Sequence, residues 1–179
     1  QKTLTLVNLG KLAGDYVARD GMTLFGTLDG ATQPYKVSIA NNATVTLDGA
    51  TINGANNENC KWAGLTCAGT ATIIVKDGTI NAVKGFFSFY PGIFVPEVSK
   101  LTLKGGTNNN GRLTASSNGS GCGIGGGRLI DCGEIEIQGG FITAYGGSGC
   151  AGIGGGMGEV GVISPSLAET LQLRAVRKL

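Results

Sequence analysis

The feature that most constrains this chain is a repeated unit of two short strand-like segments joined by a glycine turn. In residues 133–146, Ile135 and Ile137 alternate with polar residues, and Gly139 and Gly140 follow them. Alternation with period two is typical of a strand that buries one face, and paired glycines favour a turn. The same pattern recurs at residues 43–54 and 71–82 and, with an insertion at the turn, at residues 98–115.

The copies are regularly spaced. The last apolar residues of the first strands are 28, 28 and 34 residues apart, at Leu47, Val75, Leu103 and Ile137. A third apolar segment recurs at steps of 28, 31 and 29 residues, at Leu65, Ile93, Ile124 and Ile153. Such a period indicates a solenoid or a propeller, and three short strands per period are too few for a propeller blade. We therefore predict an all-β fold, a single-stranded, right-handed parallel β-helix with three sides and about five to six coils.

One domain is expected to span residues 1–179, because a chain of this length can build one hydrophobic core. Residues 1–36 are the least regular and are interpreted as an N-terminal cap and entry coil. The regular coils occupy residues 37–163, and residues 164–179 are expected to form a C-terminal cap.

A helix is predicted within the C-terminal cap. Ser166 and Glu169 have the Ser-x-x-Glu spacing of a capping box and directly follow Pro165. Solenoid ends expose unpaired strand edges, which natural proteins cover. We therefore predict a capping helix over residues 166–177, with a last strand over residues 171–176 as the alternative.

Composition argues against several classes of function. The chain has no histidine, which is the commonest general base and the commonest metal ligand. The net charge of +2 gives no electrostatic reason to expect nucleic acid or an anionic membrane as a partner. No apolar run approaches the roughly 20 residues of a transmembrane helix. Neither nucleic-acid binding nor membrane insertion is therefore expected.

The five cysteines are interpreted as small buried core residues, because free cysteine is among the most buried residue types. Their spacing fits neither a zinc ribbon nor a CxxC redox motif. An odd number leaves at least one thiol without a disulfide partner in the chain, and disulfides between Cys60 and Cys67 or between Cys122 and Cys150 stay open. The cysteines are Cys60, Cys67, Cys122, Cys132 and Cys150.

Aromatic residues supply the best candidate for a binding site. Four of the six phenylalanines lie in residues 83–96, and Trp62 and Tyr90 are 28 residues apart, which places them at the same corner of adjacent coils. Sugar rings have apolar C–H faces that aromatic rings can cover. The alternative is a local hydrophobic lid, the ordinary role of large rings. The predicted glycan-binding residues are Trp62, Phe86, Phe87, Phe89, Tyr90 and Phe94.

Acidic residues are the other candidates. Asp48 and Asp77 each follow a first strand at the turn, where a structural role or calcium binding is the hypothesis. Glu134 and Glu136 alternate along one strand, a pattern typical of a solvated face with cross-strand charge pairs. Parallel β-helices that cleave polysaccharides combine aspartate pairs with an arginine or lysine, and Arg112 and Arg128 would be the candidates here.

Two glycine-rich runs, residues 118–127 and 147–156, share the pattern Gly-Ser-Gly-Cys-(Ala)-Gly-Ile-Gly-Gly-Gly. The first contains GxGxxG, but that motif indicates a dinucleotide site only between a strand and a helix, and nothing nearby is helical. The glycines are therefore interpreted as allowing close stacking and positive φ angles at corners.

Together with residues 133–146, these runs resemble the repeats of adhesin-like, carbohydrate-binding β-helix proteins on the surface of anaerobic and gut bacteria. The resemblance covers residues 37–163. It implies a secreted or cell-surface bacterial protein with a right-handed parallel β-helix that acts in adhesion or polysaccharide binding, in some members with calcium. It supplies no catalytic residues.

The predicted function is therefore that of a non-enzymatic extracellular module whose partner is a polysaccharide, a host glycan or a surface protein. The first alternative is a polysaccharide lyase or glycoside hydrolase built on the same fold. A second alternative is a structural spacer that holds other domains away from a cell wall. No cofactor is required by the pattern, and calcium is the one that the acidic turns could hold.

Overall fold

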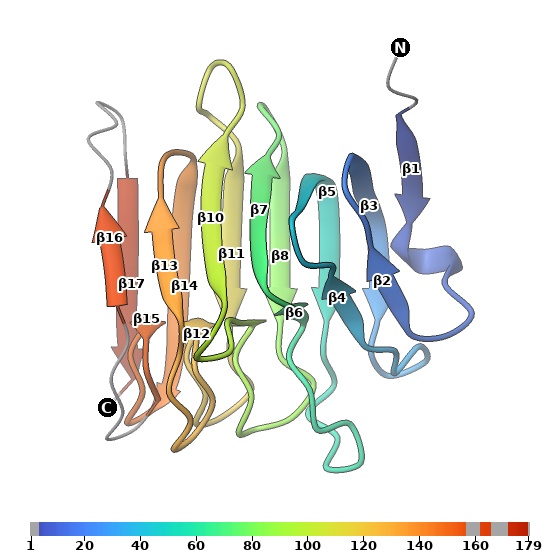
Figure 1. The fold of residues 1–179 in the computed structure, drawn as a ribbon. Helices are drawn as coiled ribbons and strands as arrows, with labels where there is room; N and C mark the ends of the chain where they lie inside the picture. The colour runs from blue at the N-terminus through green and yellow to red at the C-terminus, as the bar shows by residue number, and fades with distance from the viewer. Residues whose placement is uncertain (1–3, 157–161, 166–171, 179) are drawn as a thin grey trace.

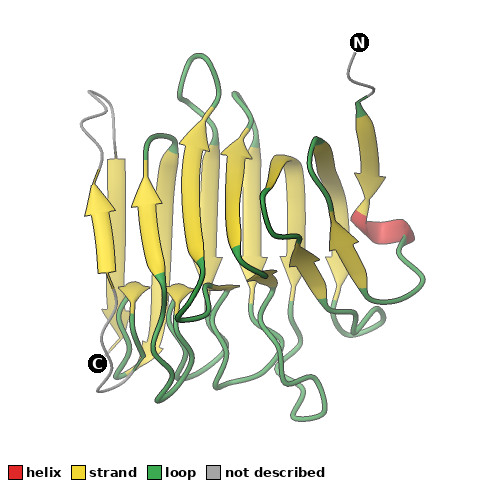
Figure 2. Ribbon diagram, in the orientation of Figure 1, coloured by secondary structure: helices red, strands yellow, loops and turns green. Residues whose placement is uncertain are grey.

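The computed structural model describes residues 4–156, 162–165 and 172–178, and within them the fold is nearly all β (Figures 1 and 2). These residues contain no α-helix, and their one helical turn is the 3-10 segment η1 (Leu9–Lys11). Every paired strand runs parallel to its neighbour, in one eleven-stranded and one six-stranded sheet. The all-β, parallel part of the predicted fold class is therefore confirmed.

The larger sheet has the strand order β16-β13-β10-β7-β5-β8-β11-β14-β17, with β3 paired to β5 and β1 paired to β3. Its strands are β1 (Thr5–Asn8), β3 (Met22–Asp29), β5 (Ala43–Asn53), β7 (Thr70–Val75), β8 (Ile80–Lys84), β10 (Lys100–Gly105), β11 (Arg112–Ser116), β13 (Glu134–Ile137), β14 (Phe141–Ser148), β16 (Val162–Pro165) and β17 (Gln172–Lys178). The smaller sheet has the order β15-β12-β9-β6-β4-β2. Its strands are β2 (Tyr16–Ala18), β4 (Val37–Ile39), β6 (Leu65–Cys67), β9 (Ile93–Phe94), β12 (Ile124–Gly125) and β15 (Ile153–Gly154).

The larger sheet curls into a half-barrel at β5. This strand pairs with β7 through residues 43–47 and with β8 through residues 51–53. Gly49 lies between the two halves with φ of +70°, a conformation that costs glycine little because it has no Cβ. We call β7, β10, β13 and β16 the first wing and β8, β11, β14 and β17 the second wing; Figure 1 shows the first in front of the second.

The six-stranded sheet confirms one set of predicted equivalences in full. Leu65 pairs with Ile93, Ile93 with Ile124, and Ile124 with Ile153. In the first wing, Leu47 pairs with Val75 as predicted.

One equivalence in the first wing was wrong. Leu103 pairs with Ile73 and not with Val75, which faces Gly105. The error is a shift of two residues, and because side chains alternate with period two, both alignments turn the same residues inward. Hydrophobic pattern alone therefore could not decide between them.

Inward-facing aliphatic side chains of strands β1 to β15 form one continuous core. The strands alternate buried and less buried residues, as in Ile80–Lys84 and Arg112–Ser116. Asn81 is a polar residue on the inward side of β8, and it is fully buried. Its amide oxygen accepts from the Ala50 N–H at 2.8 Å, and its amide nitrogen donates to the Thr79 hydroxyl at 2.9 Å and the Arg112 carbonyl at 3.1 Å.

The predicted capping helix over residues 166–177 is wrong where the structure describes it. Residues 172–178 form strand β17, which pairs with β14 from Phe141 onwards. Residues 172–175 alternate between polar and apolar, and a parallel strand covers the β14 edge with backbone hydrogen bonds, which a helix cannot supply. The capping-box residues Ser166 and Glu169 lie outside the described residues. The finer β-helix assignment and the division into cap, coils and cap stay predictions.

Candidate functional site

The six aromatic residues predicted to bind a glycan divide into two groups, and the first group is internal. Phe86 is fully buried, and Trp62 is half-buried and packs against the core. Their ring centroids are 5.8 Å apart, and the Phe86 N–H donates to the Trp62 carbonyl at 3.1 Å. Phe86 has no surface to offer a ligand, so it contributes packing and holds the start of the loop that follows β8.

Phe87, Phe89 and Tyr90 form the second group, on the loop after β8. The rings of Phe87 and Phe89 meet edge to face with centroids 4.9 Å apart, an arrangement that aromatic quadrupoles favour. The Tyr90 N–H donates to the Phe87 carbonyl at 3.0 Å, which tightens the turn between them. Phe89 is 39% exposed, so a large apolar ring faces solvent at this corner.

These three side chains line an open cavity of about 410 Å³, which we call the aromatic pocket. The guanidinium carbon of Arg128 lies 5.0 Å from the centre of the Phe89 ring. The backbone N–H of Arg128 donates to the backbone carbonyl of Phe89 at 2.8 Å. The full lining consists of Glu58, Asn59, Lys61, Phe87, Phe89, Tyr90, Arg128 and Ile130.

The aromatic pocket combines apolar rings with groups that can make directed hydrogen bonds. Ligand sites in proteins are typically concave and apolar with a few polar groups that fix orientation. Arg128 supplies fixed donors, Lys61 supplies a mobile donor, and the Glu58 carboxylate accepts. This arrangement can cover the apolar face of a ring-shaped polar molecule and bind the hydroxyl groups at its edge.

The other predicted aromatic residue, Phe94, does not line the aromatic pocket. It lies on β9 in the six-stranded sheet, in register with Thr66 and Gly125. Sequence reasoning missed Glu58, Asn59, Lys61 and Ile130 as lining residues, and it named Arg128 only as a catalytic candidate. These residues come from loops of different repeats, and the period places strands, not loop side chains.

The two aspartates predicted to bind calcium have separate partners. The Asp48 carboxylate forms an ion pair with Lys76 at 2.6 Å. Asp77 accepts from the backbone N–H groups of Asn108 at 2.7 Å and Asn110 at 3.2 Å. Among the described residues, no group of three or more carboxylate, thiol or imidazole side chains is arranged to hold a metal ion. In this structure, the aspartates stabilise neighbouring turns.

Glu134 and Glu136 form the cross-strand charge pairs that their alternation predicts. The Lys100 ammonium lies 2.9 Å from Glu134 and 3.2 Å from Glu136. Hydrogen bonds to these two carboxylates raise the pKa of Lys100. The pKa of Glu136 is lowered by its hydrogen bond from Gln138 first and from Lys100 second. A carboxylate whose pKa is lowered, as that of Glu136 is, is poorly suited to act as a general acid.

All five cysteines are buried thiols, and none forms a disulfide. This confirms the interpretation that they are core residues. Burial, helped by the neighbouring Cys150, raises the pKa of Cys122 to about 12, and burial raises the pKa of Cys67 to about 11. Thiols with raised pKa values are poor nucleophiles near neutral pH.

Comparison with protein-family models, with curated proteins and with solved structures found no match. In the part of the chain that the structure describes, no helix is long and apolar enough to cross a membrane. The fold and site define an all-β protein of parallel sheets with an aromatic pocket at one corner. Any assignment of function therefore depends on the chemistry of its own residues.

Proposed function

We propose that this chain is a right-handed, three-sided parallel β-helix and acts as a non-enzymatic module of a bacterial cell surface. The fold proposal is supported by strand register. From β6 onward, each repeat contributes one strand to the six-stranded sheet and then one to each wing, and these strands pair in parallel with their counterparts in the neighbouring repeat. A chain that returns to the same three faces once per period winds as a helix of strands.

The proposed activity is binding of a polysaccharide or host glycan for adhesion, with the aromatic pocket as the site. One observation carries it, the exposed ring of Phe89 beside Phe87 and under the Arg128 guanidinium. An exposed ring forfeits apolar burial worth about 25 cal/mol per Å². A ligand with an apolar ring face recovers that loss.

A polysaccharide-cleaving enzyme is less well supported. Both candidate arginines lie against aromatic rings, with the guanidinium of Arg112 at 4.7 Å from the Phe141 centroid and that of Arg128 at 5.0 Å from the Phe89 centroid. Among the described residues, neither arginine forms an ion pair with a carboxylate. Both arginine side chains are therefore placed for binding a ligand. The lining of the aromatic pocket contains one carboxylate, that of Glu58, and no pair of carboxylates.

The test is a binding screen of neutral and charged glycans with calcium and with EDTA, followed by variants. Phe89→Ala and Arg128→Gln are expected to weaken binding of a captured glycan about tenfold each, as anchor residues do. Phe94→Ala is the matched control and is expected to bind normally, because Phe94 lies outside the aromatic pocket. Equal losses in Phe89→Ala and Phe94→Ala, or no glycan bound at all, would contradict the proposal.

A further inference from the structure

The outer face of the second wing carries an ordered grid of side chains. On β8, β11 and β14, alternate residues are buried and the residues between them point outward. Strand register aligns the outward residues in three rows. The rows are Ile80, Arg112 and Phe141; Ala82, Thr114 and Thr143; and Lys84, Ser116 and Tyr145.

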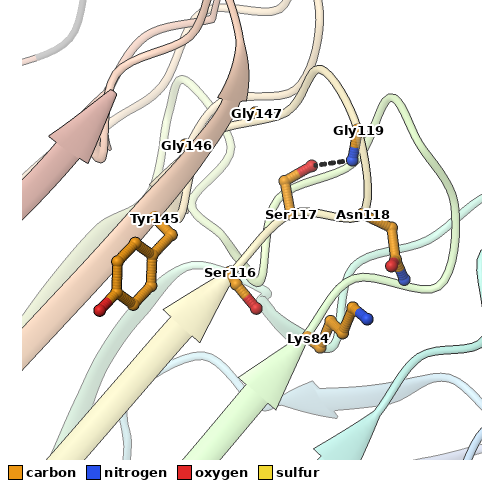
Figure 3. A pocket seen from close by; sticks show the side chains of 8 residues that line it. All are labelled: Lys84, Ser116, Ser117, Asn118, Gly119, Tyr145, Gly146 and Gly147. Atoms are coloured by element: carbon orange, nitrogen blue, oxygen red, sulfur yellow. Dashed lines mark hydrogen bonds between the residues drawn. The ribbon is translucent and has the colours of Figure 1, made fainter. Parts of the chain in front are cut away.

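A cavity lies at each end of this grid, and each cavity is lined by one cationic side chain and one aromatic side chain. At the carboxyl ends of the strands, Lys84, Ser116 and Tyr145 line a cavity of about 450 Å³ together with the loop that carries Asn118 (Figure 3). At the amino ends, Arg112, Phe141 and Ile80 line a cavity of about 440 Å³.

The end cavities are built by defined contacts. The guanidinium carbon of Arg112 lies 4.7 Å from the centre of the Phe141 ring, so the cation is held over this strand pair. At the other end, the Asn118 amide donates to the carbonyls of Gly54 and Gly85. The Ser117 hydroxyl donates to the Tyr90 carbonyl at 3.0 Å and accepts from the Gly119 N–H at 3.1 Å. These bonds fix the loop that walls the Lys84 cavity.

The middle row is made of small side chains, so the two cavities are joined by a low, hydroxyl-bearing strip. Thr114 and Thr143 supply the hydroxyl groups, and Ala82 completes the row. Four residues separate Arg112 from Ser116 along β11, which corresponds to about 13 Å of strand. A linear ligand can therefore lie along the strands and reach both end cavities.

The charge of this grid differs from that of the first wing. Lys84 and Arg112 are the only charged residues among the nine, and among the described residues neither forms an ion pair. On the first wing, by contrast, Lys100 is neutralised by Glu134 and Glu136.

The carboxylates of Asp29 and Asp77 are engaged by backbone N–H groups. Asp29 lies in the row of Lys84, two strands away through Asn53, and accepts from the Ala31 N–H at 3.1 Å. Asp77, at the corner before β8, accepts from the N–H groups of Asn108 and Asn110. Among the described residues, the two cations of the grid therefore have no carboxylate partner, and an anionic ligand can pair with them.

We propose that the outer face of the second wing binds a linear polysaccharide that carries carboxylate or sulfate groups. Lys84 and Arg112 pair with two of its anionic groups through charge-assisted hydrogen bonds. Tyr145 and Phe141 pack against sugar rings at the two ends, and the threonine and serine hydroxyls bind sugar hydroxyls between them. This site is separate from the aromatic pocket and goes beyond the function proposed for it.

The experiment measures binding of the full chain to polygalacturonate, heparin, neutral dextran and duplex DNA at two salt concentrations. The variants are Lys84→Gln, Arg112→Gln and the pair together. Lys104→Gln is the matched control, because it removes one exposed positive charge from the first wing. We expect an acidic polysaccharide to bind, to bind more weakly at higher salt, and to lose at least about tenfold in affinity in the double variant. The control should stay within about twofold of the wild type.

Several results would overturn this inference. Binding of dextran as tight as that of the acidic polymers would remove the role of charge, and DNA bound as tightly would remove the role of the sugar. An equal loss in Lys104→Gln would reduce the effect to net charge, and no binding of either acidic polymer would leave the site without a ligand. Phe89→Ala separates the two proposals, since it should impair the aromatic pocket and leave binding to the second wing intact. Thermal unfolding of each variant checks that the fold is retained.

Discussion

Asn81 allows a test in which the direction of the change in stability decides whether apolar volume or hydrogen bonding matters more at this buried position. Its side chain is fully buried, and it lies in register with the core residue Leu113 on the next strand. If the interior required only apolar volume, Asn81→Leu would stabilise the protein. The hydrogen bonds predict the opposite, because the Ala50 N–H donates to the Asn81 amide oxygen and Ala50 is itself 1% exposed. Ala50 follows the Gly49 corner, where the pairing of β5 with β7 has ended and its pairing with β8 has not begun.

The magnitude follows from these contacts. Leucine leaves the Ala50 N–H buried without an acceptor, which costs about 1–3 kcal/mol, and removes two neutral hydrogen bonds worth about 0.5–1.5 kcal/mol each. Burial of the leucine side chain returns at most about 1.5–3 kcal/mol. The net expectation is a loss of about 1–3 kcal/mol in the free energy of unfolding. For a chain of this size, such a loss lowers Tm by roughly 3–10 °C.

The assay is urea unfolding followed by circular dichroism, with Asn53→Leu as the control. Asn53→Leu makes the same chemical change at an exposed position on the neighbouring strand. This control should alter the free energy of unfolding by no more than about 0.5 kcal/mol. An Asn81→Leu protein as stable as the wild type, with an unchanged denaturant slope, would refute the reasoning. It would show that another group satisfies the Ala50 N–H.

Two further predictions concern the glycine runs and the thiols. Gly147→Ala should destabilise the protein by about 1–3 kcal/mol in thermal melts, because a Cβ at this position would overlap the Gly119 carbonyl. Gly14→Ala is the control and should be neutral in the same melts, because the space around Gly14 is open. Burial raises the pKa of Cys122 from its ordinary 9.0 to about 12, so the folded state binds this proton more tightly than the unfolded state does. Stability should therefore fall as pH rises from about 9 towards 12, and Cys122→Ala should reduce that slope; an unchanged slope would show that Cys122 does not titrate as its burial implies.

The sequence predicted the strands well because their signal is local. Alternation marks most strands of the larger sheet, and the landmarks from Leu65 to Ile153 recur with a nearly constant step, so the repeated order of strands in residues 37–154 followed from pattern alone. The Leu103 alignment failed because a shift of two residues preserves the inward face, and only backbone pairing reveals it. The capping box after Pro165 favoured a helix, but the polar–apolar alternation of residues 172–175 together with the open edge of β14 favours a strand.

The candidate site was harder to predict because burial depends on the whole fold. Phe86 and Phe89 are three residues apart in one aromatic segment, yet the first is fully buried and the second is 39% exposed. Nothing in their immediate sequence separates them. The partners of Phe89 are equally remote, since Arg128 comes from the loop after β12 and Glu58 from the loop after β5. The period locates the corner at which these loops meet, but it does not specify which side chains face the cavity there.

The grid on the second wing shows how register can create a site that has no motif. Arg112 follows Ile80 by 32 residues, and Phe141 follows Arg112 by 29, so no constant step would have aligned them. The extra residues are absorbed between β10 and β11, where Asn108 and Asn110 donate to Asp77 of the preceding repeat and hold the insertion at the corner. Because the insertion stays at the corner, β11 keeps its pairing with both β8 and β14. The alignment of Lys84 with Ser116 and Tyr145, four residues further along each strand, depends on that same pairing, so both end cavities of the proposed polysaccharide site rely on the corner that Asp77 stabilises.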